Sequence, residues 1–240
     1  SYTKGDDKGN LYLYEIATGK NRIVVEDTGV MYKWLPDSKT LIGVRKNLTE
    51  KLISDNSDKI SNELISIDVD SYEKTHLASG FFSILTSVDY HPPSRSIIFS
   101  SGAVSLPDSI SEPLSHPKYY LHSFNMNDKS IKRISDEEPV VFFCLSPKKE
   151  KILYIAMDDS SVDSIDQILR GTIYVMDIGG KNKVKVGKTE GAKDHDIVFI
   201  PFWASEDVIG YCGEIQESNR IDKAILLYNL KTDKQINFTK

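Results

Sequence analysis

The residues of this sequence that could do chemistry are a short run of aspartates and a scatter of histidines. Asp158, Asp159 and Asp163 lie close together in the chain, and carboxylate oxygens are the ligands that Ca²⁺ prefers. They lack the Asp-x-Asp-x-Asp-Gly spacing and the closing Glu of a calcium loop. A solvated acidic loop is therefore the better interpretation. We retain the three residues as candidate binding residues and expect no metal.

The histidines do not have the spacing of a zinc site. His91, His116, His122 and His195 are spread along the chain, without the His-Glu-x-x-His or His-x-Glu pattern of zinc enzymes. A Gly-x-Ser-x-Gly nucleophile turn is absent, and so is a Gly-rich phosphate loop. The sequence therefore predicts no cofactor and contains no recognisable catalytic motif.

The sequence contains a repeated unit that reads as a strand, a tight turn and a second strand. These repeats form the scaffold that would position any functional side chain. The first copy reads VMYKWLPDSKTLIGV from Val30, and its outline returns from Val88, Phe142 and Phe199. Each copy is an apolar or aromatic run, a polar turn and a second apolar run. Internal repeats of this length indicate solenoids or propellers. The successive copies lie 56, 55 and 57 residues apart when aligned on Pro36, Pro92, Pro147 and Ala204.

A second landmark keeps nearly the same period. An alternating strand rich in β-branched and aromatic residues precedes a turn of Gly, Asn or Asp, and a short strand follows. This strand ends at Glu15, Asp68, Asn125, Asp177 and Asn229, with spacings of 53, 57, 52 and 52 residues. Each period therefore holds four strands, which predicts an all-β fold, a β-propeller of about five four-stranded blades. A β-sandwich with accidental self-similarity is the alternative.

We expect one domain over residues 1–240, with blades at about 1–28, 29–79, 80–136, 137–188 and 189–240. The first blade lacks its innermost strand, because only Ser1 to Thr3 precede the loop before Leu11. Two explanations remain open: excision from a longer precursor, which we favour, or a complete five-bladed ring with one three-stranded blade.

The repeat resembles the TolB-like, WD40-type propeller repeat, whose outline is Trp-Ser-Pro-Asp-Gly, an apolar strand, and then Ile-Tyr-Val-x-Asp before a Gly turn. The best matches are Trp34 to Lys39 and Ile173 to Asp177, and Ser146-Pro147 keeps the central dipeptide. The resemblance covers essentially the whole chain. It implies protein–protein binding on one face, usually outside the cytoplasm, and it transfers no catalytic residue.

The charge and the hydropathy of the sequence argue against some classes of binding partner. The net charge is −5 and no basic stripe occurs, so a nucleic-acid partner is not expected. No apolar run approaches the roughly 20 residues of a membrane helix. Cys144 and Cys212 fall in different blades, and we expect two buried thiols rather than a disulfide.

The long insertions share one position in each blade, between the second and third strands, and therefore lie on one face. Loops on a rigid scaffold commonly carry function. His116 and the three aspartates lie in these insertions, and Asp194 and His195 lie at the entry of the last blade. Phe81 and Phe82 fall where the chain enters an innermost strand. The four insertions are Arg45 to Asn62, Gly102 to Lys118, Asp158 to Gly171 and Gly213 to Lys223.

Two functions remain open at this point. The first is a non-catalytic recognition propeller that binds a protein through the face with the long loops, outside the cytoplasm as the resemblance implies. The second is the propeller module of a hydrolase or lyase, with its active site at the channel mouth or in a separate domain. A cluster of carboxylates or histidines at the channel mouth would favour the enzyme.

Overall fold

The computed structural model of this protein describes residues 2–3, 10–25, 32–46, 62–82, 88–105, 119–135, 139–157, 171–189, 200–217 and 220–239. All regular structure in these ranges is β-strand. The chain divides into two compact units, residues 1–117 with 125–129 and residues 118–124 with 130–240. That residues 1–240 form one domain, with the blade bounds given above, stays a prediction.

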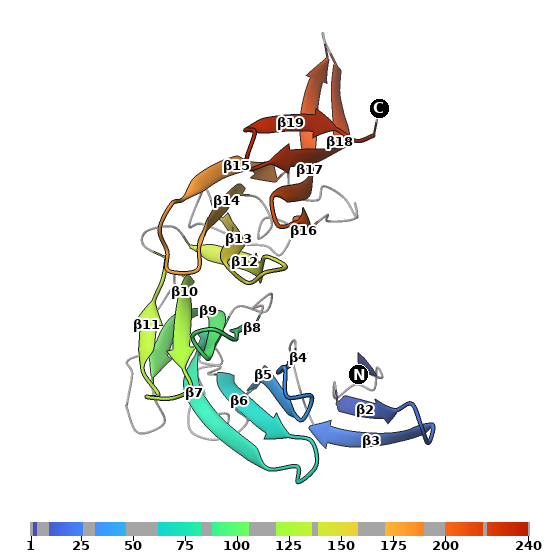
Figure 1. The fold of residues 1–240 in the computed structure, drawn as a ribbon, viewed down its shortest axis with the longest axis vertical. Helices are drawn as coiled ribbons and strands as arrows, with labels where there is room; N and C mark the ends of the chain where they lie inside the picture. The colour runs from blue at the N-terminus through green and yellow to red at the C-terminus, as the bar shows by residue number, and fades with distance from the viewer. Residues whose placement is uncertain are drawn as a thin grey trace, which may run out of the picture. The chain divides into compact units, whose positions relative to one another are not determined.

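The first unit begins with a three-stranded antiparallel sheet, as expected for a blade without its innermost strand. A group of four strands and then a pair of strands follow it along the chain (Figure 1). The first sheet holds β1 (Tyr2–Thr3), β2 (Leu11–Glu15) and β3 (Lys20–Val25). The next strands are β4 (Tyr32–Trp34), β5 (Thr40–Lys46), β6 (Asn62–Asp68) and β7 (Lys74–Phe82). The last two are β8 (Val88–His91) and β9 (Ser96–Ser105).

Strands β7 and β9 are joined in a way that the sequence pattern did not predict. We expected separate blades and an insertion beginning at Gly102. Instead β9 runs on to Ser105, and Ser79 pairs with Ser105 while Gly80 pairs with Val104. The strands of the second and third blades are therefore hydrogen-bonded into one continuous sheet.

The second unit holds a hairpin and two four-stranded antiparallel sheets, each with its strands in chain order. The hairpin is β10 (Tyr120–Asn125) and β11 (Ile131–Arg133). One sheet holds β12 (Val140–Leu145), β13 (Lys151–Ala156), β14 (Gly171–Asp177) and β15 (Val184–Thr189). The other holds β16 (Phe202–Ser205), β17 (Val208–Glu217), β18 (Arg220–Asn229) and β19 (Lys234–Asn237).

One backbone hydrogen bond recurs in four blades and confirms that the sequence alignment is a structural one. In each of these blades, the residue that follows the last residue of the third strand donates its backbone N–H to the carbonyl of the residue just before the second strand, at 2.8 to 3.0 Å. The repeat found in the sequence therefore corresponds to a contact that recurs in the structure. The four donor and acceptor pairs are Val69 to Lys39, Met126 to Arg95, Ile178 to Glu150 and Leu230 to Asp207.

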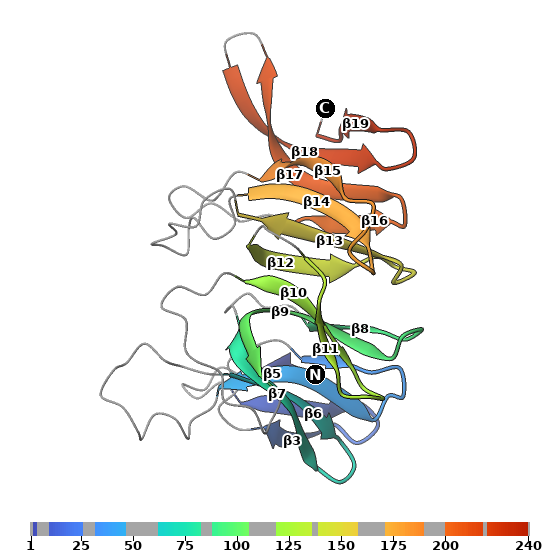
Figure 2. The same ribbon diagram turned by 90° about the vertical axis from the view of Figure 1, so that its left-hand side faces the viewer.

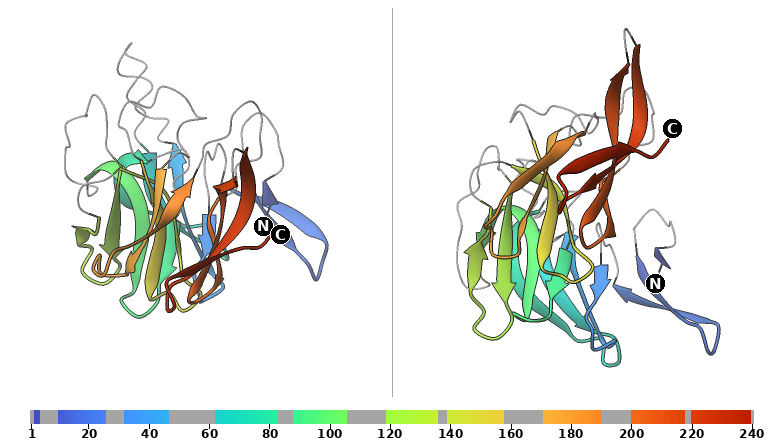
Figure 3. Two further views of the ribbon diagram at one scale, coloured as in Figure 1. Left: turned by 90° about the horizontal axis from the view of Figure 1, so that it is seen from above. Right: turned by 45° about the horizontal axis from the view of Figure 1, so that its top comes forward.

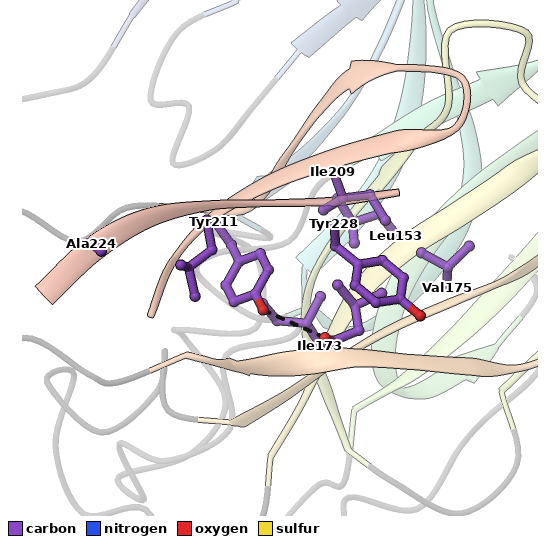
Figure 4. Close-up of a cluster of buried hydrophobic side chains, with 9 residues drawn as sticks. Leu153, Ile173, Val175, Ile209, Tyr211, Ala224 and Tyr228 are labelled. Atoms are coloured by element: carbon purple, nitrogen blue, oxygen red, sulfur yellow. Dashed lines mark hydrogen bonds between the residues drawn. The ribbon is translucent and has the colours of Figure 1, made fainter. Parts of the chain in front are cut away.

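Adjacent sheets pack through alternate residues of their strands, since side chains alternate between the two faces. In β18, Tyr228 packs in one buried cluster with Ile173 and Val175 of the sheet before it (Figure 4). Leu226 belongs to the same cluster. In the first unit Leu11 and Leu13 of β2 lie in one cluster with Ile65 and Ile67 of β6. The positions can be counted back from the last residue of each third strand, such as Asp177 or Asn229. The side chains one and three positions before it face the preceding blade, and those two and four positions before it face the following blade.

Candidate functional site

The two edges of the sheets differ in the length of their connections. The turns from first to second strand and from third to fourth strand contain two to six residues. Three of the connections from second to third strand contain 14 or 15 residues, and almost all of these residues lie outside the described ranges. One edge therefore holds only tight turns, and we call it the turn edge. The other, the loop edge, is the candidate functional site.

Side chains at the turn edge hold the turns. The Asp68 carboxylate accepts the backbone N–H groups of Asp70 and Ser71 at 3.0 and 2.8 Å, and the Asn229 amide oxygen accepts those of Lys231 and Thr232 at 2.9 and 3.1 Å. Hydrogen bonds from the backbone and hydroxyl of Ser71 hold the pKa of Asp68 below its ordinary value. These polar groups are occupied with turn formation, as the sequence indicated.

Charged side chains also tie the last two sheets together at the turn edge. Asp207 accepts Lys151 Nζ at 3.2 Å and Lys231 Nζ at 2.6 Å. The hydrogen bond from Lys231, and the Coulomb field of both lysines, lower the pKa of Asp207 despite its partial desolvation. The backbone N–H of Lys148 donates to Glu206 at 2.8 Å. This network cross-links neighbouring blades, so we assign it a structural role.

The innermost strands of the first unit contain a paired charge rather than a catalytic cluster. Lys33 Nζ lies 2.9 Å from Asp89 Oδ2, and the side chains of Lys33 and Asp89 are 41% and 6% exposed. The other Asp89 oxygen accepts the backbone N–H of Tyr90 at 2.9 Å. Nearby, His91 Nδ1 and Ser94 Oγ are 2.6 Å apart. Within the described ranges, no three His, Cys, Asp or Glu residues are placed to hold a metal ion.

The residues singled out from the sequence cannot be grouped into a site. Phe81 and Phe82 end strand β7, but their side chains lie outside the described part of the chain. The other six also lie outside it, so their candidacy stays a prediction: His116, Asp158, Asp159, Asp163, Asp194 and His195.

The prediction of a loop over Gly213 to Lys223 is wrong. This segment belongs to a pair of antiparallel strands instead. Strands β17 and β18 stay in register from Val208↔Asn229 out to Glu217↔Arg220. Strand β16 pairs only as far as Gly210, and β19 pairs from Leu226 onward. The outer part of the hairpin thus extends beyond both neighbours, as Figures 2 and 3 show. We call residues 214–223 the ribbon.

The ribbon sequence explains its register. Only two residues, Ser218 and Asn219, separate β17 from β18 in the sequence. Glu214 is directly opposite Lys223, and Glu217 is opposite Arg220. Opposite charges at directly opposed positions favour one pairing register. The opposed charges and the separation of two residues were the signals that could have identified this hairpin from the sequence.

The cysteines lie in different sheets and are not joined by a disulfide. Both are half-buried rather than fully buried as expected. No helix long and apolar enough to cross a bilayer occurs in the parts of the chain that the structure describes.

His122 is a buried histidine whose contacts lie within its own β-hairpin. It lies in β10 directly opposite Arg133 of β11, and its Nδ1 is 3.0 Å from the carbonyl oxygen of Tyr120. Burial, the largest cause, and the nearby positive charge of Arg133 together lower the pKa of His122 to about 4, against the opposing effect of the hydrogen bond to Tyr120. His122 is therefore neutral at pH 7.

Acidification is expected to destabilise the second unit through His122. The folded-state pKa of about 4 lies below the ordinary value of 6.5, so the unfolded chain binds the proton more readily. This contribution, at most about 3 kcal/mol, is complete above pH 6.5 and is lost as the pH falls toward 4. Urea unfolding at pH 7 and pH 5 should show the loss for the wild type and for a His76→Gln control, but not for His122→Gln. An equal loss in His122→Gln would contradict the assignment.

Comparison with known proteins places this geometry in a fold. A scan against models of protein families found no match, and a search of curated proteins found none either. TolB from Acinetobacter baumannii superposes with a TM-score of 0.60 at 16% identity, over 97% of this chain and 49% of that one. Oligogalacturonate lyase from Vibrio parahaemolyticus gives 0.61 at 11% identity, over 97% and 60%. This chain has a TolB-like β-propeller fold.

A third structure, the β-propeller domain of the Trilobed protease from Pyrococcus furiosus, superposes with a TM-score of 0.56 at 13% identity, over 95% of this chain and 61% of that one. The present chain thus spans about half to three fifths of the length of these proteins. They comprise TolB, a lyase and a protease domain, so the TolB-like propeller does not by itself decide between recognition and catalysis.

Proposed function

We propose that this TolB-like propeller is a non-catalytic recognition domain that binds a protein partner through its loop edge. The observation that carries the proposal is the ribbon. Its strands extend past both neighbouring strands of their sheet. A two-stranded arm that leaves the sheet presents backbone and side chains to a partner on both sides.

The uneven distribution of chain length supports the same edge. The described turns at the opposite edge are all short, and most are closed by backbone hydrogen bonds, whereas the long connections accumulate at the loop edge. A rigid repeat scaffold can carry such additions without loss of its core. The likeness to TolB supports an extracytoplasmic location as part of this proposal.

Shortening the ribbon is expected to abolish partner binding and leave the fold intact. Replacing residues 214–223 by Asn-Gly keeps the Gly213↔Ala224 pair, which is related to Glu217↔Arg220 by an even number of residues. It therefore keeps the hydrogen-bonding parity that a two-residue turn needs. Immobilised wild type and variant would be compared for the proteins that they retain from an extract of the source organism, with at least a tenfold loss expected for the variant.

The matched control is Lys181→Ala, an exposed change in the turn between β14 and β15 at the turn edge. It should retain the same proteins as the wild type. The melting temperature of each variant shows whether the fold is intact. A ribbon variant that folds and retains an unchanged set of proteins would contradict binding through the loop edge.

A lyase or hydrolase module is the second candidate, favoured by the likeness to oligogalacturonate lyases, one of them in complex with manganese. Asp89 is the sole carboxylate on the described innermost strands, and it is ion-paired. Incubation with an oligogalacturonate and Mn²⁺, followed by absorbance of the unsaturated product, is expected to show no turnover. Turnover that Asp89→Asn abolishes would replace the recognition proposal.

A further inference from the structure

The backbone hydrogen bonds between β17 and β18 alternate along the two strands, as in any antiparallel pair. The N–H of Leu230 donates to the carbonyl of Asp207 at 2.8 Å, and these two residues flank the first pair of the ladder. A pair flanked in this way has no hydrogen bond between its own two backbones, so the bonded pairs begin at the next residue of β17 and recur at every second one. The odd-numbered residues of β17 therefore point their backbone groups at β18, and the even-numbered ones point away from it.

The backbone groups that point away from β18 meet a neighbouring strand only over the first part of β17. Gly210 is paired with Phe202 of β16, and no strand in the described part of the chain pairs with β17 beyond it. In the ribbon, Glu214 and Gln216 are the residues of β17 that point away from β18. Their two N–H and two C=O groups form one edge of the ribbon, which we call the β17 edge.

The other side of the ribbon has a shorter edge. Strand β19 pairs with β18 from Leu226 onward, and the N–H of Phe238 also donates to the carbonyl of Ile225 at 2.8 Å. Strand β18 therefore extends past its neighbour over residues 220–224, whereas β17 extends past Gly210 over residues 211–217. An added strand finds more backbone to pair with along β17 than along β18.

The ribbon lacks the features by which proteins block an edge against further strands, such as a bulge or a proline. Register shifts interrupt several other ladders, among them β2–β3, β6–β7 and β14–β15. The β17–β18 ladder is the longest in the described ranges and has no shift, and residues 211–217 contain no proline. Four of its charged residues are opposite in pairs, Glu214 with Lys223 and Glu217 with Arg220, and together carry no net charge. The β17 edge is thus regular and open to pairing.

We propose that the partner binds the ribbon by strand addition, with an extended segment of the partner lying along the β17 edge as a third strand. This inference rests on the proposed function and specifies which part of the partner the ribbon takes. The N–H and C=O groups of Glu214 and Gln216 bond to the main chain of the segment, which supplies affinity with little demand on its sequence. A two-stranded ribbon is marginally stable by itself in water, and a third strand stabilises it.

Two substitutions at one position test the main-chain bonding. The probe is a library of random short peptides displayed on phage and selected on the immobilised protein. Gln216→Pro removes an N–H of the β17 edge but keeps the bonds of Ile215 and Glu217 to β18, so it should weaken binding of the selected peptides about tenfold or more. The matched control, Gln216→Ala, changes only the side chain and should bind the peptides like the wild type. The melting temperatures of both variants show whether the fold is intact.

Amide hydrogen exchange provides a second readout that does not depend on proline. In the free protein the N–H groups of Ile215 and Glu217 are bonded within the ribbon, so they should exchange more slowly than those of Glu214 and Gln216. A bound peptide should slow exchange at Glu214 and Gln216 about tenfold or more and leave the other two unchanged. Slowing at none of the four amides would contradict strand addition at this edge.

The remaining outcomes separate this inference from the proposed function. Peptides that need the ribbon but bind Gln216→Pro as tightly as the wild type would overturn strand addition and leave binding through the loop edge standing. A library that yields only peptides bound equally well by the variant with the shortened ribbon would also overturn strand addition, since an edge that bonds to the main chain accepts many sequences. Failure of the proposed function shows separately, as an unchanged set of proteins retained by the shortened variant.

Discussion

Replacing Leu153 with Ala is expected to lower the free energy of unfolding of the second unit by about 3 kcal/mol. Leu153 is fully buried in the middle of β13, between Cys144 of β12 and Val175 of β14. Its side chain packs in the cluster that joins the sheets β12–β15 and β16–β19. The substitution removes apolar contacts and leaves a cavity that two hydrogen-bonded neighbouring strands cannot readily close.

The measurement is urea unfolding followed by tryptophan fluorescence, because Trp203 packs against the same cluster. Val184→Ala is the matched control. Val184 lies in the same four-stranded sheet but is 41% exposed, so its truncation should cost less than about 1 kcal/mol. Equal losses for the two variants would mean that the contact between these sheets contributes little to stability.

The repeat was predictable from the sequence because its signals are local. Asp37 illustrates this, since its carboxylate accepts the N–H groups of Lys39 and Thr40, both at 2.8 Å. A hydrogen bond that spans two or three residues leaves its trace in the residue types of a short window. The same logic applies to Asp68 and Asn229, whose turns were identified correctly.

Pairing between distant strands leaves no such trace. The β7–β9 ladder and the ribbon both arise where strands continue beyond the blade outline. The insertions expected from Gly102 and Gly213 were placed by their shared position between the second and third strands of each blade, a pattern that does not show how far a strand continues. The innermost pair is a similar case, since Lys33 and Asp89 are 56 residues apart and neither has a local signature. The side chains predicted at the loop edge lie outside the described ranges.

Gly171→Ala is expected to destabilise the protein by about 3 kcal/mol or more, although it adds only one methyl group. Gly171 begins β14, and a Cβ there would lie 2.1 Å from the carbonyl oxygen of Ala156 and 2.9 Å from its carbonyl carbon. Strands β13 and β14 would have to separate to admit it, which would weaken the adjacent Thr172↔Ala156 pair. Gly179→Ala, in the turn that follows β14, has no atom within 4 Å of the new methyl group and should change stability by less than about 0.5 kcal/mol.

A second substitution identifies the cause of the loss at Gly171. The closest atoms belong to the backbone of Ala156 rather than to its side chain, so Gly171→Ala combined with Ala156→Gly should remain as unstable as Gly171→Ala alone, or more so. Recovery of stability in the double variant would show that the methyl groups collide instead. The thermal unfolding midpoints of the two single variants and the double variant decide this. A close approach of two backbones thus accounts for glycine where β14 leaves the loop edge.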